Sequence, residues 1–386
     1  MLSFSLNNIR VLDLTRILAG PWCTQNLAEL GAEVIKVERP VSGDDSRQWG
    51  PSYIKKPSSG MSTYFSSCNR GKHSVTANFK DPEDLKTLRE LAKQVDIFIE
   101  NYKPGTLEKY GLGYEELKKI NPQLIYISIS AYGQYGPKAR QPGYDYVFQG
   151  VGGLMSYTGI ADNEAGAGPI RVGVAVIDLM TGMYATTAAL AALQKRAQTQ
   201  KGCYIDLSLL DVAVAMHANL GSEFLNTGNL PIRSGNKHSN CAPYDVFSTL
   251  DGHFILAIGN DTQFECLRSI LNNEELNQSK FNKNLDRLNN RDELKEILKP
   301  ILKTKTTQEW GVLLNEQNIP WGPINTLNDV MNDPQVQFRK IVQKTQHDQL
   351  GIIYHLKNPL LSAHGKTQSP PMLGQHNHLY GFNTQD

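Results

Sequence analysis

One carboxylate, Asp178, interrupts an otherwise apolar stretch between residues 169 and 194. No Lys or Arg lies within a helical turn of it on either side, and a buried charge without a partner is costly. Two explanations are open from the local pattern. Asp178 could cap the helix that the Ala- and Leu-rich second half predicts, with Thr181 three residues on. It could instead act on a ligand, because Gly173 and Gly182 would allow close approach.

The elements that must position Asp178 begin at the N-terminus. Residues 11–14 and 33–39 predict strands, and residues 22–30 predict a helix that opens after Pro21 and ends at Gly31. Such a strand–helix–strand unit favours a parallel sheet with Rossmann-like winding. The first turn holds a single glycine, so the dinucleotide fingerprint GxGxxG is absent and the sequence does not indicate NAD.

Strands and helices continue to alternate beyond a long polar segment, residues 40–67, which reads as loop. The loop Asn101–Gly105 follows a strand, where ligands of open α/β sheets bind. Gly150–Gly153 could cradle a phosphate, but no Gly-Lys-Ser/Thr follows, so close packing is the default interpretation. The expected strands are residues 72–78, 95–100, 124–129 and 202–208, and the expected helices are residues 81–94, 114–120 and 210–225.

The composition changes near Asn226, where a polar loop begins. A hairpin is expected over residues 244–258, followed by helices at 262–271 and 292–302, which together indicate a small α+β domain. After a helix at 310–317, the Pro-rich segment 319–324 reads as a stiff crossover, and a late hairpin covers 340–354.

The whole chain has the composition of an ordinary globular protein, with 386 residues, 40% hydrophobic, 20% charged and a net charge of +1. This balance suggests neither nucleic acid nor an anionic membrane as a partner. Five scattered cysteines without a CxxC motif favour reduced thiols in the cytoplasm and argue against structural zinc. The N-terminus lacks the blocks of a signal peptide. The Asp178 stretch favours a buried core helix over a membrane span.

Several segments together carry a family resemblance. They are Val11-Leu-Asp-Leu-Thr-Arg-Ile-Leu-Ala-Gly-Pro21, Leu30-Gly-Ala-Glu-Val-Ile-Lys-Val-Glu-Arg39, Glu100-Asn-Tyr-Lys-Pro-Gly105, Gly143-Tyr-Asp145, the Asp178 stretch and Pro371-Met-Leu-Gly-Gln-His376. The sequence resembles the class III CoA-transferases (CaiB/BaiF family) over nearly its full length. Within that family it is most similar to the succinate–hydroxymethylglutarate (glutarate) CoA-transferases.

The resemblance implies an α/β fold with a Rossmann-like large domain built from both ends of the chain. Residues 1–200 and 325–386 would form that domain, and residues 226–304 the small α+β domain. Residues 201–225 and 305–324 would be the linkers. Two chains would interlock as a homodimer.

The resemblance also assigns a role to each site residue. Asp178 would be the nucleophile, and family CoA contacts fall on Arg16, Arg39, Lys72, Asn101, Tyr102, Lys109 and Tyr132. Cationic side chains suit the phosphates of CoA. Taken alone, Lys72 and Arg39 would read as solvated surface cations. Two positions depart from the formyl-CoA transferases: Lys109 replaces their Arg, and Pro142 their Lys.

The implied chemistry moves CoA from an acyl-CoA donor, expected to be succinyl-CoA, to a free acid such as glutarate, through aspartyl anhydride and thioester intermediates. Backbone N–H groups from Gly150–Gly153 or from residues 234–238 would stabilise the oxyanions. No metal and no permanently bound cofactor are expected. Candidates for the acceptor's distal carboxylate are Arg171, Lys237 and His238.

Three alternatives stay open at this stage. One is a transferase for another acid, of the formate/oxalate or carnitine type. The second is a 2-methylacyl-CoA racemase, which shares the fold but uses His where this chain has Tyr144; tyrosine is a poor base near neutral pH. The third is a non-catalytic CoA-binding protein, against which the intact Asp178 motif argues.

Overall fold

The structure is a computed structural model that describes residues 5–55, 60–361 and 367–383. The chain forms two compact units. The larger unit comprises the chain up to Met155, Arg171–Pro231 and everything from Pro334 onward. The smaller unit comprises Ser156–Ile170 and Ile232–Asp333. Each is described by itself below.

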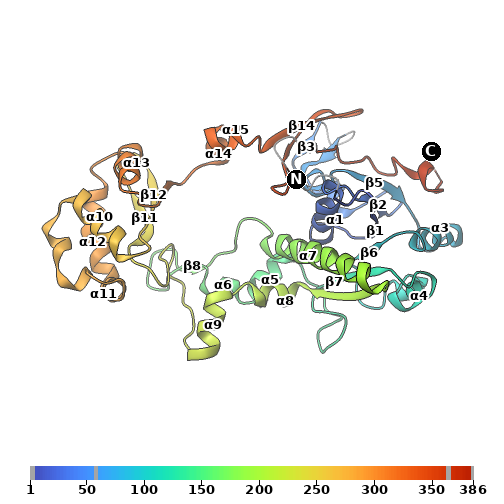
Figure 1. The fold of residues 1–386 in the computed structure, drawn as a ribbon, viewed down its shortest axis with the longest axis horizontal. Helices are drawn as coiled ribbons and strands as arrows, with labels where there is room; N and C mark the ends of the chain where they lie inside the picture. The colour runs from blue at the N-terminus through green and yellow to red at the C-terminus, as the bar shows by residue number, and fades with distance from the viewer. Residues whose placement is uncertain (1–4, 56–59, 362–366, 384–386) are drawn as a thin grey trace. The chain divides into compact units, whose positions relative to one another are not determined.

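A six-stranded parallel sheet organises the larger unit (Figure 1). Its order is β10-β7-β6-β1-β2-β5, and every neighbouring pair is parallel. In chain order this is the Rossmann arrangement, in which the winding reverses between the first and fourth strands, here β1 and β6. The strands are β1 (Arg10–Asp13), β2 (Glu33–Glu38), β5 (Lys72–Thr76), β6 (Ile97–Glu100), β7 (Ile125–Ser130) and β10 (Cys203–Ser208).

Helices cover both faces of this sheet. On one face, α1 (Ala19–Glu29) and α7 (Val176–Thr199) pack their small and apolar residues onto the isoleucines of β6 and β7. On the other, α3 (Pro82–Ala92) and α4 (Tyr114–Ile120) contribute leucines to a second core. The double covering explains why the strands read as nearly continuous apolar runs.

Gly182 brings α1 and α7 into close contact, and the two helices lie side by side in Figure 1. A Cβ added at Gly182 would lie 2.7 Å from the Ala19 carbonyl oxygen and 2.9 Å from the Trp22 Cβ. Only glycine allows this approach. The contact places the first turn of α7, which carries Asp178, beside the N-terminus of α1.

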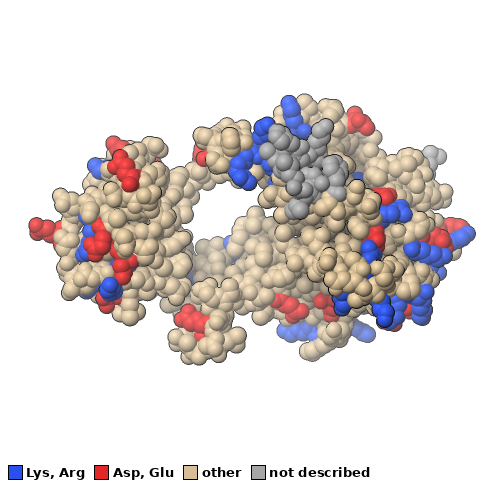
Figure 2. Space-filling model, viewed as in Figure 1, with Lys and Arg blue, Asp and Glu red and all other residues tan. Residues whose placement is uncertain are grey.

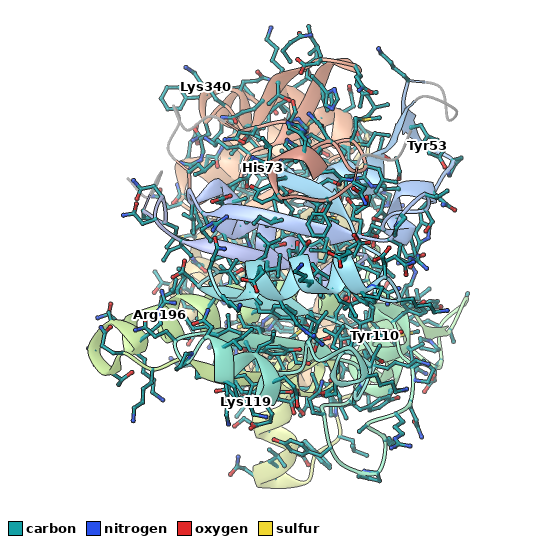
Figure 3. The ribbon with its side chains drawn as sticks, turned by 90° about the vertical axis from the view of Figure 1, so that its right-hand side faces the viewer. Tyr53, His73, Tyr110, Lys119, Arg196 and Lys340 are labelled. Atoms are coloured by element: carbon teal, nitrogen blue, oxygen red, sulfur yellow. The ribbon has the colours of Figure 1, made fainter. Side chains whose placement is uncertain are left out.

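The C-terminal segment lies against β5, the edge strand. The His376 backbone N–H donates to the Ser74 carbonyl, and its ring stacks on His73 with 4.5 Å between ring centroids. Figure 3 shows His73 beneath the C-terminal ribbon. The same part of the chain includes the hairpin β14 (Val342–His347) and β15 (Gly351–Leu356). Backbone pairing to the tail therefore covers the exposed edge of the sheet.

The smaller unit has its own core. The antiparallel sheet β11 (Tyr244–Ser248), β12 (His253–Ala257) and β13 (Trp321–Pro323) packs against a group of helices around buried Phe254, Phe264 and Trp310. Those helices are α10 (Asp261–Leu271), α11 (Asn284–Asn289), α12 (Arg291–Leu302) and α13 (Thr307–Glu316).

Short elements complete the fold. In the larger unit they are β3 (Tyr53–Ile54), β4 (Met61–Ser62), α2 (Thr63–Cys68), α5 (Asp145–Val151), α8 (Leu209–Ala215), α9 (Ala218–Thr227) and α15 (Pro334–Phe338), and the division between the units falls within α6 (Leu154–Tyr157). In the smaller unit they are β8 (Gly159–Ile160), β9 (Gly168–Pro169) and α14 (Leu327–Asn332). Among the described residues, 3-10 turns cover Asp45–Gln48, Glu108–Tyr110, Glu274–Asn277, Ser279–Phe281 and Asn377–Leu379.

The observed division of the chain differs from the expected one. Residues 201–225, expected as a linker, contain β10, a strand of the central sheet, together with α8. Residues 305–324, also expected as a linker, contain α13 and β13 of the smaller unit, which runs to residue 333 and takes in residues 156–170. Strand pairing and core packing thus incorporate segments that the family resemblance implied as linkers.

Two local expectations also fail. The segment 40–67 is not all loop, because α2 begins at Thr63 behind a Ser62 cap. The helix expected over 210–225 is broken after Ala215, where Ala218 adopts a positive φ of 47°.

The burial of α7 is lower than expected. Met183, Tyr184 and Leu190 are each more than a third exposed. Among the described residues, α7 is the one helix whose length and composition alone would allow it to cross a membrane, and 44% of its apolar window is buried within the chain. A helix that packs on the sheet through one face leaves its other apolar face uncovered here.

Candidate active site

A cavity of about 190 Å³ opens at the carboxyl ends of β1 and β6, where the winding of the sheet reverses. Open α/β sheets bind ligands at this position. Four of the predicted site residues line it: Arg16, Asn101, Tyr102 and Asp178. The remaining lining comes from the start of α1, Asp45, Lys103–Pro104, the end of β7 with Ala131, residues 139 and 141–144, and Leu209.

The turn after β1 is fixed to the turn after β6. The Arg16 N–H donates to the Asn101 side-chain oxygen (2.9 Å), and the Asn101 side-chain N–H donates back to the Arg16 carbonyl (2.8 Å). The Arg16 guanidinium lies over the Tyr102 ring, 4.8 Å from its centroid. Asn101 and Tyr102 therefore hold Arg16 in the wall of the cavity.

Arg16 keeps hydrogen-bonding capacity for a ligand. Its Nη1 lies 3.4 Å from Asp45, and its buried Nε has no acceptor among the described residues. Arg39 pairs with the same Asp45. Asp45 thus links two of the predicted CoA-contacting cations beside the cavity, and both sides of this ion group remain partly exposed.

The structure places four predicted contacts outside the cavity lining: Arg39, paired with Asp45, and three others. Lys109 is exposed on the 3-10 turn after β6. Tyr132 packs edge-to-face on Phe148, with 5.0 Å between ring centroids, behind the lining residue Ala131. The third, Lys72, is buried. Their assignments as CoA contacts stay predictions.

Lys72 lies in a buried ion network and not on the surface. Its Nζ donates to Asp13 (3.1 Å), Asn69 (2.8 Å) and a backbone carbonyl, and the side chains of Lys72 and Asp13 are fully buried. Lys36 forms a similarly buried pair with Asp44 at 2.9 Å. Burial opposes the ionisation of Asp13, but Lys72 and Lys36 outweigh it and lower the pKa of this carboxyl.

Asp178 is the third residue of α7 and is 8% exposed. It does not cap its own helix: the N-cap residue is Ala175, which makes no side-chain cap. The cap comes instead from Asp145, whose Oδ1 accepts the N–H groups of Ile177 (2.7 Å) and Asp178 (3.2 Å). Sequence reasoning quoted Asp145 within a motif but gave it no role.

The Asp178 carboxylate takes part in no hydrogen bond or ion pair within the part of the chain that the structure describes. Burial, and after it the neighbouring Asp145, raises the pKa of Asp178 to about 7. The N-terminal end of a helix favours an anion by only about 0.3–1 kcal/mol, whereas a rise of about three pKa units corresponds to about 4 kcal/mol. Loss of water therefore outweighs the helix dipole, and the carboxylate remains unusually basic.

The first of the two loops expected to supply oxyanion donors is not available. The N–H groups of Gly152 and Gly153 are bonded to the carbonyls of Phe148 and Gly150 at the end of α5. Gly152 packs closely on Ala213 of α8. A Cβ added at Gly152 would lie 2.5 Å from the Ala213 Cβ, so this contact requires glycine. The close-packing interpretation of this segment is the one the structure supports.

The second expected loop, residues 234–238, belongs to the smaller unit and uses most of its N–H groups internally. Those of Gly235, Lys237 and His238 donate to the carbonyls of Gly159, Ser234 and Tyr244. In the larger unit, by contrast, Leu18 and Ala19 line the cavity at the start of α1, and their N–H groups have no acceptor among the described residues.

The residues considered for an acceptor's distal carboxylate are not among those that line this cavity. Arg171 donates to the carbonyls of Val172 and Gly173 and lies over the Tyr146 ring. Lys237 is paired with Asp292 at 3.0 Å, and His238 stacks on Tyr244. Within the described residues, no group of three or more His, Cys, Asp and Glu side chains could hold a metal ion.

Comparison with known proteins agrees with this geometry. Residues 6–377 match the profile described as "CoA-transferase family III". The chain belongs to this family, and it is a CoA-transferase.

Within the family, the chain is similar to several particular proteins. The chain is 42% identical to a mouse "Succinyl-CoA:glutarate CoA-transferase" over 376 residues, covering 96% of this chain and 84% of the relative. It is 40% identical to a "Succinate--glutarate CoA-transferase" of Agrobacterium fabrum, covering 96% and 93%. A crystal structure of a CaiB/BaiF family protein from Brucella suis superposes with a TM-score of 0.84 at 41% identity, covering 97% of both chains.

Proposed function

We propose that this enzyme transfers CoA from succinyl-CoA to a free dicarboxylate such as glutarate, with Asp178 as the nucleophile. The observation that carries the mechanism is the buried, unpaired Asp178 carboxylate in the wall of a cavity at the reversal point of the sheet. The names of the relatives support the choice of acids.

The chemistry begins with attack of an Asp178 carboxylate oxygen on the thioester carbonyl. The C–S bond breaks, CoA leaves as the thiolate, and the acyl group remains as a mixed anhydride. The thiolate then attacks the aspartyl carbonyl of the anhydride, releases the donor acid and leaves an aspartyl-CoA thioester. The acceptor carboxylate attacks that thioester, breaks its C–S bond and gives a second anhydride with release of CoA thiolate. The thiolate then attacks the acceptor's acyl carbonyl, and the C–O bond to Asp178 breaks, so that the new acyl-CoA forms and the Asp178 carboxylate is regenerated.

The surroundings of Asp178 suit these steps. An ionised carboxylate with a raised pKa is a stronger nucleophile, and the covalent steps that follow its ionisation transfer no proton. The N–H groups of Leu18 and Ala19 would stabilise the oxyanions. The scheme uses CoA thioesters as substrates and needs no permanently bound cofactor.

The cavity is sized for the reacting end of the substrate. Pockets that enclose whole drug-sized ligands have volumes of about 300–1,000 Å³, and this one measures about 190 Å³. The thioester and adjoining pantetheine would occupy it, while the phosphates would lie outside near Arg16 and Arg39.

The test is to incubate the enzyme with succinyl-CoA and a panel of free acids in deuterated water and to analyse the products by mass spectrometry. Glutarate should yield glutaryl-CoA and free succinate. A 2-methylacyl-CoA should gain no deuterium at its α-carbon, because Tyr144 offers no effective base. Deuterium uptake without CoA exchange would favour the racemase. Exchange with another acid, but not glutarate, would replace the acceptor and keep the reaction.

A homodimer is part of the proposal. The larger unit leaves several large apolar side chains exposed, and exposed apolar patches mark interaction surfaces. Figure 2 shows few charged side chains where Figure 1 draws the middle of α7. The exposed apolar side chains of the larger unit include Met183, Tyr184, Phe224, Leu225, Ile352, Tyr354 and Leu356. Interlocked chains should remain dimeric in sedimentation experiments at low micromolar concentration; a monomer there would contradict the proposal.

We also propose a cytoplasmic location. All five cysteines are unpaired, and Cys23 and Cys68 are buried, as expected of thiols that stay reduced.

A further inference from the structure

Asp145 and Asp178 form a pair of carboxylates that belong to different helices. Asp145 opens α5, yet its Oδ1 accepts the N–H groups of Ile177 and Asp178 in the first turn of α7, at 2.7 and 3.2 Å. The N-cap residue of α7, Ala175, contributes no side-chain acceptor. The turn that carries the nucleophile is thus anchored by a residue 33 positions earlier in the chain.

Gln149 holds the Asp145 carboxylate in place. Its side chain is fully buried, its Nε2 donates to Asp145 Oδ2 (2.7 Å), and its Oε1 accepts the N–H of Val172 (2.8 Å). One amide therefore connects α5, the Asp145 carboxylate and the segment that leads into α7. Every polar atom of the Gln149–Asp145 pair has a partner, which is typical of a rigid buried network.

We propose that Asp145, held by Gln149, is the positioning residue for Asp178: it fixes the first turn of α7 and places a second negative charge beside the nucleophile. The inference rests on the proposed function, since it assigns Asp145 a task only if Asp178 is the nucleophile. Asp145 forms no bond to substrate and is not consumed in any step.

The negative charge of Asp145 affects Asp178 because few cationic groups near Asp178 could neutralise it. Tyr64 of α2 interacts electrostatically with both carboxylates. The cavity wall adds Arg16, Asp45, Tyr102, Lys103 and Tyr144.

Arg16 is already paired with Asp45 and stacked on Tyr102, so it does not neutralise the two aspartates. Both aspartates are at least nine-tenths buried, so solvent and salt screen their repulsion weakly. The like charge acts in the same direction as burial and raises the pKa of Asp178.

The experiment separates the anchor from the charge with two variants of the full-length enzyme. Asp145→Asn keeps an oxygen acceptor for α7 and removes the charge, whereas Asp145→Ala removes both. The control is Asp81→Asn, the same chemical change at the exposed cap of α3, whose carboxylate accepts the Glu83 N–H. The readouts are kcat and KM for succinyl-CoA with glutarate, or with the best acceptor of the panel, between pH 5 and 9.

In Asp145→Asn, the acidic limb of the kcat profile should move to lower pH by about half a unit or more, because one carboxylate no longer opposes ionisation of the other. In Asp145→Ala, kcat should fall about tenfold or more at every pH, since a misplaced nucleophile loses its alignment. The KM for succinyl-CoA should stay within about twofold in both variants, and Asp81→Asn should behave as wild type. An Asp145→Asn profile that superimposes on wild type would overturn the role of the charge, and a loss confined to KM would overturn the positioning role.

A second measurement does not need turnover. The Asp178 carboxyl is titrated by carbon-13 NMR in wild type and in Asp145→Asn, with its resonance assigned from Asp178→Asn. A lower Asp178 pKa in Asp145→Asn supports the inference, and an unchanged one contradicts it. This result is informative even if Asp145→Ala fails to fold or if the enzyme uses neither succinyl-CoA nor glutarate, so failure of the proposed function and failure of the positioning role are distinguishable.

Discussion

Two buried groups of charge in the larger unit are organised in opposite ways. In the network beneath β1, β2 and β5, each carboxylate meets a cation, as in Lys72–Asp13 and Lys36–Asp44. At the start of α7, two carboxylates lie together without a cation: Asp145 accepts hydrogen bonds from Gln149 and from the N–H groups of Ile177 and Asp178, and the Asp178 carboxylate accepts none among the described residues. The pKa of Asp13 is accordingly lowered and that of Asp178 raised.

The difference indicates separate roles for the cation-paired carboxylates and for the Asp145–Asp178 pair. A buried carboxylate with its cation remains ionised and holds strands together, and it costs stability when one partner is lost. A buried carboxylate without a cation costs stability as it stands, and such groups gather at functional sites, where a raised pKa serves the chemistry. Three predictions test this contrast, beginning with the largest effect.

Replacing the unpaired carboxylate should abolish the reaction. We expect Asp178→Ala to lose at least about 1,000-fold in kcat, because every covalent step requires this oxygen. Binding of succinyl-CoA, measured by calorimetry, should remain, since Asp178 does not hold the CoA phosphates. Retention of a tenth of the wild-type rate would exclude Asp178 as the nucleophile.

Removing one partner of the paired network should destabilise the fold rather than the reaction. Lys72→Met leaves Asp13 buried without its cation, and we expect the free energy of unfolding in urea to fall by about 3–5 kcal/mol. Arg39→Ala is the matched control, because its pair with Asp45 is half-exposed and should contribute less than about 1 kcal/mol. Equal stabilities of the two variants would mean that Lys72 is not a structural cation.

Neutralising Asp178 should stabilise the fold in a pH-dependent manner. The folded-state pKa of Asp178 lies above the ordinary value of 3.8, so the folded state holds this proton more tightly than the unfolded chain. Wild-type stability therefore falls as the pH rises through this range, and Asp178→Asn avoids that loss.

We expect the gain from Asp178→Asn to be larger at pH 8 than at pH 5 by about 2 kcal/mol. Urea denaturation at both pH values measures it. A gain that does not change with pH would show that Asp178 is ionised normally in the folded protein.

The sequence predicted the parts of the fold that depend on local pattern. The alternation of strands and helices from Val11 to Ser208 was recognisable because each strand is an apolar run bounded by turn residues, and the carboxyl-end location of Asn101 and Tyr102 followed from it. The helix break after Ala215 was missed, because it depends on packing between distant segments, and the strand expected at residues 202–208 is present although the implied domain division placed it in a linker.

The site shows the same limit. Asp178 was misread as a possible cap because the true cap, Asp145, is remote in sequence, and no local rule links them. Lys72 taken alone read as a surface cation. A usable signal did exist: Asp13, Lys36 and Lys72 each lie in a strand of a doubly covered parallel sheet, and charges in such strands generally require one another.

The contact at Gly182 has a consequence for which parts of the cavity can adapt to different acids. Because the backbone of α7 touches the Ala19 carbonyl there, Asp178 and the turn after β1 keep a constant spacing whatever acyl group is bound. Chain-length preference would then depend on other parts of the lining, such as the loop residues 139 and 141–144. Evolution of a new acceptor acid in this architecture would proceed by exchanging that loop, while the chemical step is inherited unchanged.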